Sequence, residues 1–125
     1  MAGDGARSDW YRLINETRGS ELGGRITVAR SFWSRGLGLM FRRGLASGAG
    51  LVIDPCGSIH TMWMRFPIDV LYVDREHRVV RADEAVPPWR VGPLRTGSRY
   101  VVELPAGVIR ASGTHVGDRL RLEPA

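Results

Sequence analysis

The chain of 125 residues contains no lysine, a single cysteine and no long run of apolar residues. One cysteine cannot form an internal disulfide, which agrees with a reducing compartment. No apolar run approaches the roughly 18 residues that a membrane-spanning helix needs. Residues 1–19 also lack the apolar core of a signal peptide. We therefore expect a cytoplasmic protein with no membrane partner.

All eighteen basic residues are arginines, and the chain has a net charge of +5 and a pI near 10.6. A net positive charge of this kind is typical of nucleic-acid-binding proteins, because arginine contacts phosphates. The arginines are scattered, however, and only Arg42 and Arg43 are adjacent. Arginine in place of lysine, together with much glycine and alanine, also indicates the codon bias of a GC-rich genome. We therefore do not expect nucleic-acid binding.

The composition, with 43% hydrophobic and 25% charged residues, is that of a globular protein of one domain. Residues 1–9 are small and polar, and we expect a disordered lead before a single β-domain over residues 10–125. Strand-like segments separated by Gly, Pro and Asp predict an antiparallel sandwich or open barrel. The predicted strands are 10–16, 25–29, 50–54, 58–65, 68–74, 78–84, 99–104 and 119–123.

One segment has helical periodicity instead. Apolar residues recur at helical spacing from Phe32 to Phe41, and Ser31 stands at the capping position before them. Two glycines inside this segment each cost about 1 kcal/mol relative to alanine, so the helix needs tertiary packing. We predict one packed α-helix over residues 31–41, and a short helix over residues 108–112.

The stretch CGSIHTMWMRFPIDVLYVD, residues 56–74, concentrates unusual side chains in apolar sequence. If it is extended, alternate positions share one face, which carries a thiol, a hydroxyl, an imidazole and two thioethers. These positions are Cys56, Ser58, His60, Met62 and Met64. Buried polar groups need a partner, which can be protein, water, a ligand or a metal. The stretch therefore indicates a site without naming its chemistry.

Two chemical roles can be weighed for this face. Cys56, His60 and Met64 are ligands that suit Cu(I), but four residues of a strand span about 13 Å, too far for one ion. A cysteine nucleophile would need His60 within hydrogen-bond reach and a carboxylate to orient the ring. A buried thiol and a structurally bonded histidine account for the same residues. We therefore expect no metal, no cofactor and an unreactive Cys56.

Two carboxylates lie in apolar strand-like sequence, Asp69 in PIDVLYVD and Glu103 in VVELPAG. A charge in such a place needs an ion pair or hydrogen bonds, and Arg65 and Arg99 are candidate partners for Asp69. The two carboxylates could instead serve acid–base chemistry. The Pro- and Gly-rich stretch 86–97 predicts a loop long enough to cover a site.

Four motifs follow one another along the chain: GLMFR at 38–42, IHTMWMRFPIDVLYVD at 59–74, VPP at 86–88 and VVELPAG at 101–107. Together they resemble the uncharacterised family called domain of unknown function 192, from about Leu13 to Leu122. The resemblance implies a compact, mainly β fold with one packed helix, and it supplies no activity, substrate or cofactor. The chain resembles the members with an IHT-type motif. The signature positions that this implies are His60, Thr61, Met64, Pro67, Asp69 and Glu103.

We expect a monomeric or homodimeric domain that binds a small polar ligand, for example a carbohydrate. The pocket would be lined by residues 58–69 and closed by the 87–93 loop, with polar side chains for hydrogen bonds and a tryptophan for an apolar wall. One alternative is a hydrolase or proton-transfer enzyme that uses His60 and a carboxylate. Another is an interaction domain whose motif is purely structural. The candidate ligand-binding residues are His60, Thr61, Trp63, Asp69, Trp89 and Glu103.

Overall fold

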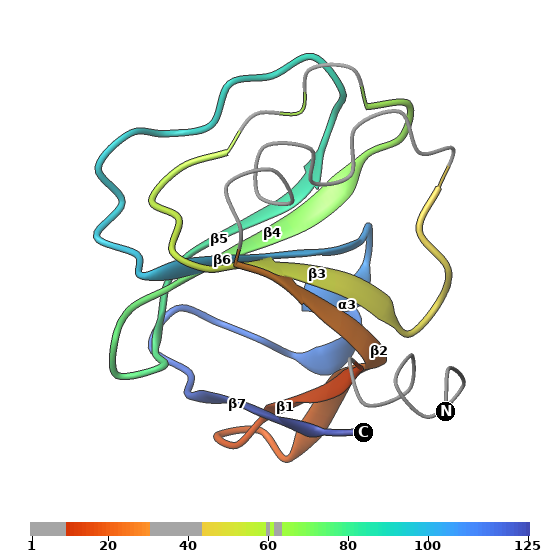
Figure 1. Ribbon diagram of the computed structural model, residues 1–125, viewed down its shortest axis with the longest axis vertical. Helices are drawn as coiled ribbons and strands as arrows, with labels where there is room; N and C mark the ends of the chain where they lie inside the picture. The colour runs from red at the N-terminus through yellow and green to blue at the C-terminus, as the bar shows by residue number, and fades with distance from the viewer. Residues whose placement is uncertain (1–9, 31–43, 60, 62–63) are drawn as a thin grey trace.

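The computed structural model describes residues 10–30, 44–59, 61 and 64–125 (Figure 1). The predicted disordered lead over residues 1–9 and the predicted helix over residues 31–41 lie outside the described residues.

In the described part of the chain, seven strands form a single sheet in the order β5-β4-β6-β3-β2-β1-β7. Neighbouring strands are antiparallel except β2 and β3, which run parallel. The strands are β1 (Tyr11–Asn15), β2 (Ser20–Ala29), β3 (Ala49–Ile53), β4 (Ile68–Val73), β5 (Val79–Val86), β6 (Tyr100–Pro105) and β7 (Leu120–Pro124).

The sheet curls until its two edge strands meet at one end (Figure 1). Arg78, just before β5, forms an antiparallel bridge with Arg119, just before β7. The Leu120 N–H also donates to the His77 carbonyl at 2.8 Å. The sheet is therefore a half-barrel, and the predicted mainly β, open-barrel fold is confirmed.

The concave face of the sheet holds the larger hydrophobic core. Its buried side chains come from both edge strands and from the centre of the sheet, for example Val79, Leu120 and Val102. The short helix α3 (Val108–Ser112) follows β6 and adds Ile109 to this core. The short helix predicted over residues 108–112 is thus confirmed.

The convex face carries a second apolar cluster, formed by β3, β4 and β6. Successive side chains of a strand point to opposite faces, so a strand that is covered on both sides is apolar along its whole length. All six residues of β4 are buried, which is what a position between the two clusters requires. The strand residues of the second cluster include Leu51, Ile53, Ile68, Val70, Tyr72 and Val101.

Most predicted strands are confirmed with small changes at their ends, but β2 differs. It begins at Ser20, although residues 20–24 include two adjacent glycines, Gly23 and Gly24, which are poor strand formers. Antiparallel pairing with β1 holds this first half in place, with register shifts around Leu13. Tertiary pairing here overrides local sequence preference.

The predicted strand over residues 58–65 is wrong: its described residues belong to neither a strand nor a helix. Their backbone groups bond to the loop after β5 instead of to a neighbouring strand. The Thr61 N–H donates to the Arg90 carbonyl, and the Gly92 N–H donates to the Ile59 carbonyl, both at 2.7 Å.

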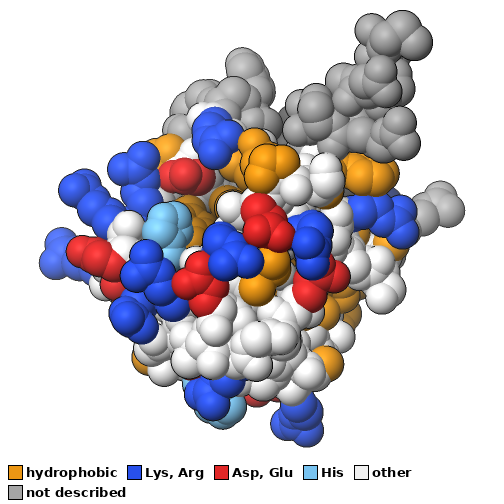
Figure 2. All heavy atoms as spheres, turned by 90° about the horizontal axis from the view of Figure 1, so that it is seen from below, with side chains coloured by type: hydrophobic (Ala, Val, Ile, Leu, Met, Phe, Trp, Pro, Cys, Tyr) orange, Lys and Arg blue, Asp and Glu red, His pale blue; other side chains and the backbone are white. Residues whose placement is uncertain are grey.

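Surface charges near β1 and β7 are mixed in sign. Arg12 contacts Glu21 at 2.6 Å and Glu123 at 3.0 Å, and Arg121 contacts Glu16 at 3.1 Å. Figure 2 shows arginine and carboxylate side chains interleaved on the side seen from below. Exposed ion pairs of this kind add little stability, but they keep the arginines of this side from forming one basic patch.

A buried polar network ties the turn between β1 and β2 to the segment after α3. The Asn15 amide donates to Thr114 Oγ1 and to Asp118 Oδ2, both at 3.0 Å. Asp118 Oδ2 also accepts from Arg18 Nε and from the His115 N–H, both at 2.9 Å. Burial by itself would raise the pKa of Asp118, but these hydrogen bonds outweigh it and lower the pKa to about 2.

The first prediction concerns this network. Asp118→Ala should lower the free energy of unfolding at pH 7 by about 1–3 kcal/mol, because buried donors lose their acceptor. The folded pKa lies below the ordinary 3.8, so this contribution is present above pH 4 and is lost as the pH falls toward 2. Urea denaturation at pH 7 and pH 3 measures both effects, with the exposed Glu76→Ala as control. A difference from the parent that does not shrink at pH 3 would contradict the assignment.

Candidate functional site

The described residues of the connection between β3 and β4, namely 54–59, 61 and 64–67, lie over the convex face and are bonded to the loop between β5 and β6, residues 87–99. Ile59, Met64 and Phe66 of the connection pack on the apolar cluster of the convex face. Backbone hydrogen bonds join the connection to the loop at several points along both segments. We call these two segments together the cover.

Thr61 fastens the two parts of the cover together. Its side chain is buried, and its Oγ1 donates to the Pro87 carbonyl at 2.7 Å and accepts from the Arg90 N–H at 2.8 Å. The Thr61 carbonyl accepts a further hydrogen bond from the Trp89 N–H at 2.9 Å. The threonine of the IHT motif therefore has a structural role, since its hydroxyl is already used within the protein.

The other predicted ligand contacts of the cover divide into two groups. His60 and Trp63 lie outside the described residues. Trp89 is described, and its side chain is 49% exposed on a left-handed backbone with φ of 64°. Left-handed conformation is unusual for a residue with a large side chain, and such positions are enriched at functional sites.

Asp69 is fully buried in β4, and its hydrogen bonds with the described residues all go to backbone groups. Its Oδ1 accepts from the Ala85 N–H at 2.8 Å, and its Oδ2 accepts from the Gly107 and Ile109 N–H groups at 3.1 and 2.9 Å. The carboxylate thus joins the end of β5 to the first turn of α3. A helix start carries unpaired N–H groups, and an anionic acceptor there is favourable.

The ion-pair partners predicted for Asp69 are wrong. Arg99 instead pairs with Asp54, with Nε and Oδ1 3.0 Å apart, and no ion pair joins Arg65 to Asp69 in the described structure. Three backbone N–H groups can satisfy a buried carboxylate without a cation, and they are fixed in place by the fold.

Glu103 is the second buried carboxylate, and its environment is different. It lies in β6 between Leu51 of β3 and Val70 of β4, and it is 3% exposed. Its Oε1 has no hydrogen-bond partner among the residues that the structure describes. Desolvation by burial raises the pKa of Glu103 to about 7 from its ordinary 4.5. Burial therefore favours the protonated form of this side chain more than for an ordinary glutamate.

The two carboxylates do not form a catalytic pair. Asp69 is paired with Leu104 and Val70 with Glu103 in the β4–β6 ladder. Residues directly opposite each other on paired strands share a face, whereas neighbours along one strand do not. Asp69 therefore points to the concave face with Leu104. Glu103 points to the convex face with Val70. The sheet itself separates them, and acid–base chemistry by this pair is excluded.

Two residues that the sequence did not single out complete this region. Tyr72 is buried on the convex face, and its pKa is raised to about 12, chiefly by burial and then by the charge of Asp83. Gly92 of the cover lies against it: a Cβ on Gly92 would stand 2.7 Å from the Ile59 oxygen and 3.0 Å from the Tyr72 hydroxyl. Only glycine allows the loop to approach so closely. Nothing in the sequence distinguishes Gly92 from the other loop glycines.

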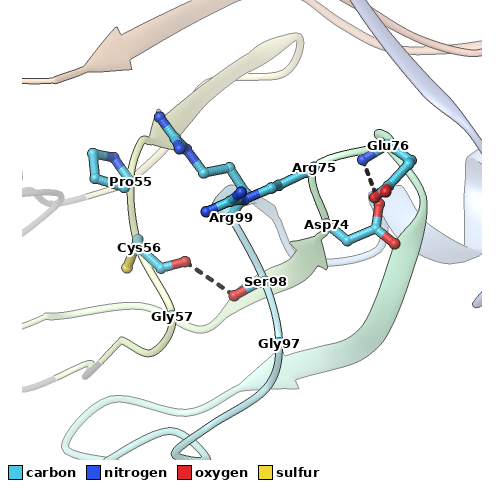
Figure 3. A pocket seen from close by; sticks show the side chains of 9 residues that line it. All are labelled: Pro55, Cys56, Gly57, Asp74, Arg75, Glu76, Gly97, Ser98 and Arg99. Atoms are coloured by element: carbon cyan, nitrogen blue, oxygen red, sulfur yellow. Dashed lines mark hydrogen bonds between the residues drawn. The ribbon is translucent and has the colours of Figure 1, made fainter.

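Cys56 lies beside a polar cleft of about 440 Å³ at the other end of the cover (Figure 3). Its thiol donates to the Ser58 carbonyl at 2.8 Å, and its own carbonyl accepts from Ser98 Oγ at 3.0 Å. Arg75 and Arg99 extend toward each other across the cleft (Figure 3). This cleft was not predicted, because it joins three segments that are distant in the sequence.

Metal-binding and membrane-spanning features can be assessed for the described residues. Among them, no group of three or more His, Cys, Asp or Glu side chains could hold a metal ion. No helix in the same part of the chain is long and apolar enough to cross a membrane.

Comparison with known proteins places these features in a family context. The model of the family DUF192, described as an uncharacterized ACR, matches residues 13–122. A UPF0127 protein from Pyrococcus furiosus is 35% identical over 111 residues, which cover 86% of this chain and 95% of that protein. A UPF0127 protein from Pyrococcus horikoshii is 31% identical over 112 residues, covering 87% of this chain and 96% of that protein.

Two solved structures resemble the fold. A protein of unknown function from Novosphingobium aromaticivorans has a TM-score of 0.72 at 21% identity and covers 89% of this chain and 82% of its own. A protein from Sinorhizobium meliloti, provisionally named a transcription regulator, has a TM-score of 0.69 at 25% identity and covers 90% and 91% of the two chains. These likenesses support the fold and add no activity.

The second prediction tests the role of Asp69. Asp69→Ala should lower the free energy of unfolding by about 3 kcal/mol, because three buried N–H groups lose their acceptor. Asp69→Asn should have a smaller effect, since the amide oxygen can still accept. Chemical denaturation measures both variants, with the exposed Arg75→Ala as a near-neutral control. If Asp69→Ala is as stable as Arg75→Ala, the carboxylate does not hold β5 and α3 together.

Proposed function

The chain belongs to the DUF192 family, and on that premise we propose that it binds a small polar ligand on the convex face of its sheet, beneath the cover. The ligand contacts Glu103 and is enclosed by residues 58–69 and the 87–93 loop. Hydroxyl-bearing molecules such as carbohydrates, and small amines, have the required donor groups. A cytoplasmic location is part of the proposal, since a single cysteine suits a reducing compartment.

The unpartnered Glu103 oxygen carries this proposal. A buried polar atom with no hydrogen bond costs about 1–3 kcal/mol, and proteins rarely retain one without a reason. The cross-strand neighbours Leu51 and Val70 are apolar and cannot supply a donor. An O–H or N–H group of a ligand would remove that cost by donating to the oxygen. Ligand binding would therefore be more favourable here than at a carboxylate whose oxygens are all bonded already.

The remaining polar residues of the family signature support the choice of Glu103. Each side-chain oxygen of Thr61 and Asp69 already takes part in a hydrogen bond within the protein. Glu103 is the described member with an unused acceptor atom. His60 is proposed as a second ligand contact, because it adjoins Thr61 in the sequence.

A proton-transfer enzyme is the second candidate. The observation that favours it is the pKa of Glu103, which at about 7 is well matched to a group that accepts and donates protons at neutral pH. In such an enzyme Glu103 would work with His60, because Asp69 faces the other side of the sheet. A rate that inflects near pH 7 and is abolished in Glu103→Gln would support it over simple binding.

The third prediction tests ligand binding directly. Thermal denaturation is followed at pH 8 with glucose, glycerol or ethanolamine, which offer sugar hydroxyls, simple hydroxyls and an amine. At least one of them should raise the melting temperature, by the equivalent of about 2.7 kcal/mol at a hundred times its Kd. Glu103→Gln should lose that shift, and the exposed Glu76→Gln should keep it. No shift with any probe, or the same shift in Glu103→Gln, would reject the proposal.

The fourth prediction concerns pH and needs no ligand. The folded pKa of Glu103 lies above its ordinary 4.5, so the folded state binds more protons than the unfolded state between these values. The contribution of Glu103 to the free energy of unfolding is therefore greatest below about pH 4.5. It falls by about 3 kcal/mol as the pH rises through 7. Glu103→Gln should lack this loss between pH 5 and pH 8. Parallel pH profiles for parent and variant would show that the carboxylate is solvated or paired.

A further inference from the structure

The tip of the loop between β5 and β6 exposes apolar side chains to solvent. Val91 is 73% exposed and Leu94 is 77% exposed, and the neighbouring Trp89 is 49% exposed. We call residues 89–95 the apolar tip. Single exposed apolar residues are ordinary, but three within six positions of one loop form a concentrated apolar surface.

The apolar tip is held in shape by its base. The Arg90 N–H donates to Thr61 Oγ1 and the Gly92 N–H donates to the Ile59 carbonyl, which fixes the backbone at Arg90 and Gly92. Trp89 and Arg95 at its two ends have left-handed backbone, with φ of 64° and 57°. Figure 1 shows the segment between β5 and β6 at the outer margin of the molecule, away from the sheet. A projecting segment that is already ordered loses little conformational freedom when it binds.

The charged residues of the loop between β5 and β6 have one sign. Between Glu84 and Glu103 the sequence contains no aspartate or glutamate, while Arg90 and Arg95 lie within the tip itself. Both arginines are exposed, and no carboxylate pairs with either of them in the described part of the chain. This differs from the mixed charges near β1 and β7. An anionic surface is therefore the complementary partner.

We propose that the apolar tip inserts into the surface of an anionic lipid bilayer, with Val91 and Leu94 among the acyl chains and Arg90 and Arg95 at the headgroups. Tryptophan and arginine suit the boundary between water and lipid, as Trp89 does here. A cytoplasmic membrane surface is negatively charged and attracts basic segments. A stable protein interface, by contrast, needs about 800 Å² from each partner, which a narrow tip of three apolar side chains does not supply.

This proposal revises the sequence-based expectation of no membrane partner. That expectation rested on the lack of a long apolar run, which is a test for spanning helices and does not detect a short surface loop. The proposal goes beyond ligand binding at Glu103 and does not depend on it. Glu103→Gln should therefore bind membranes as the parent does, so the two proposals can fail separately.

The fifth prediction is tested by co-sedimentation with vesicles. The full chain should bind vesicles of phosphatidylcholine mixed with phosphatidylglycerol at least tenfold more tightly than vesicles of phosphatidylcholine alone. The double variant Val91→Asp/Leu94→Asp should lose binding to the mixed vesicles at least tenfold. Val116→Asp is the matched control, because Val116 is also exposed, at 62%, but lies in the segment between α3 and β7. It should bind as the parent does.

Variants of Arg90 and Arg95 test the electrostatic part of vesicle binding separately. Arg90→Gln/Arg95→Gln should reduce the preference for phosphatidylglycerol and weaken the salt dependence of binding, while the melting temperature stays that of the parent. Three results would overturn the proposal: no binding of the parent to mixed vesicles, equal binding by Val91→Asp/Leu94→Asp, or equal loss in Val116→Asp. Dimers that dissociate in the double variant, without vesicle binding by the parent, would assign the tip to self-association instead.

Discussion

The hydrogen bonds that Asp69 makes with three backbone N–H groups are the interaction on which the site depends. They join β4, the end of β5 and the start of α3, which are far apart in the sequence. The loop over the convex face begins just after β5 ends, so its starting point is set by this carboxylate. The side chain of Ile109 in α3, in turn, packs in the core of the concave face. One buried side chain thus positions elements on both faces of the sheet.

Glu103 shows the contrasting case of a carboxylate that the fold surrounds but does not bond. Both residues lie on neighbouring central strands and both are buried, yet one accepts three hydrogen bonds and the other leaves an oxygen unused. The difference arises from the face each one occupies. The concave face offers a helix start with free N–H groups, whereas the convex face beside Glu103 offers the apolar Leu51 and Val70. A fully bonded acid and an acid with an unused oxygen atom are thus separated by one step along paired strands.

The strands could be predicted from the sequence because local composition sets them: apolar residues in short runs, ended by Gly, Pro or Asp. The short helix over residues 108–112 was also predictable, because Pro105 and Gly107 end the strand and a proline suits the first turn of a helix. The segment 58–65 was not, because its alternation matches a strand while its hydrogen bonds go to a loop thirty residues away. Burial of Asp69 and Glu103 was visible in their apolar flanks. Their different partners were not, because partners depend on which strands become neighbours.

A spatial consequence follows from the pairing of β1 with β7. Tyr11 lies opposite Pro124, so the first and last strands are adjacent and antiparallel (Figure 1). The start of β1 and the end of β7 therefore lie side by side, far along the surface from the cover. A short linker could join them, and the domain could be inserted into a loop of another protein with little distortion of its host. The architecture thus has the geometry of a module that can be carried within a longer chain without disturbing the cover on the convex face.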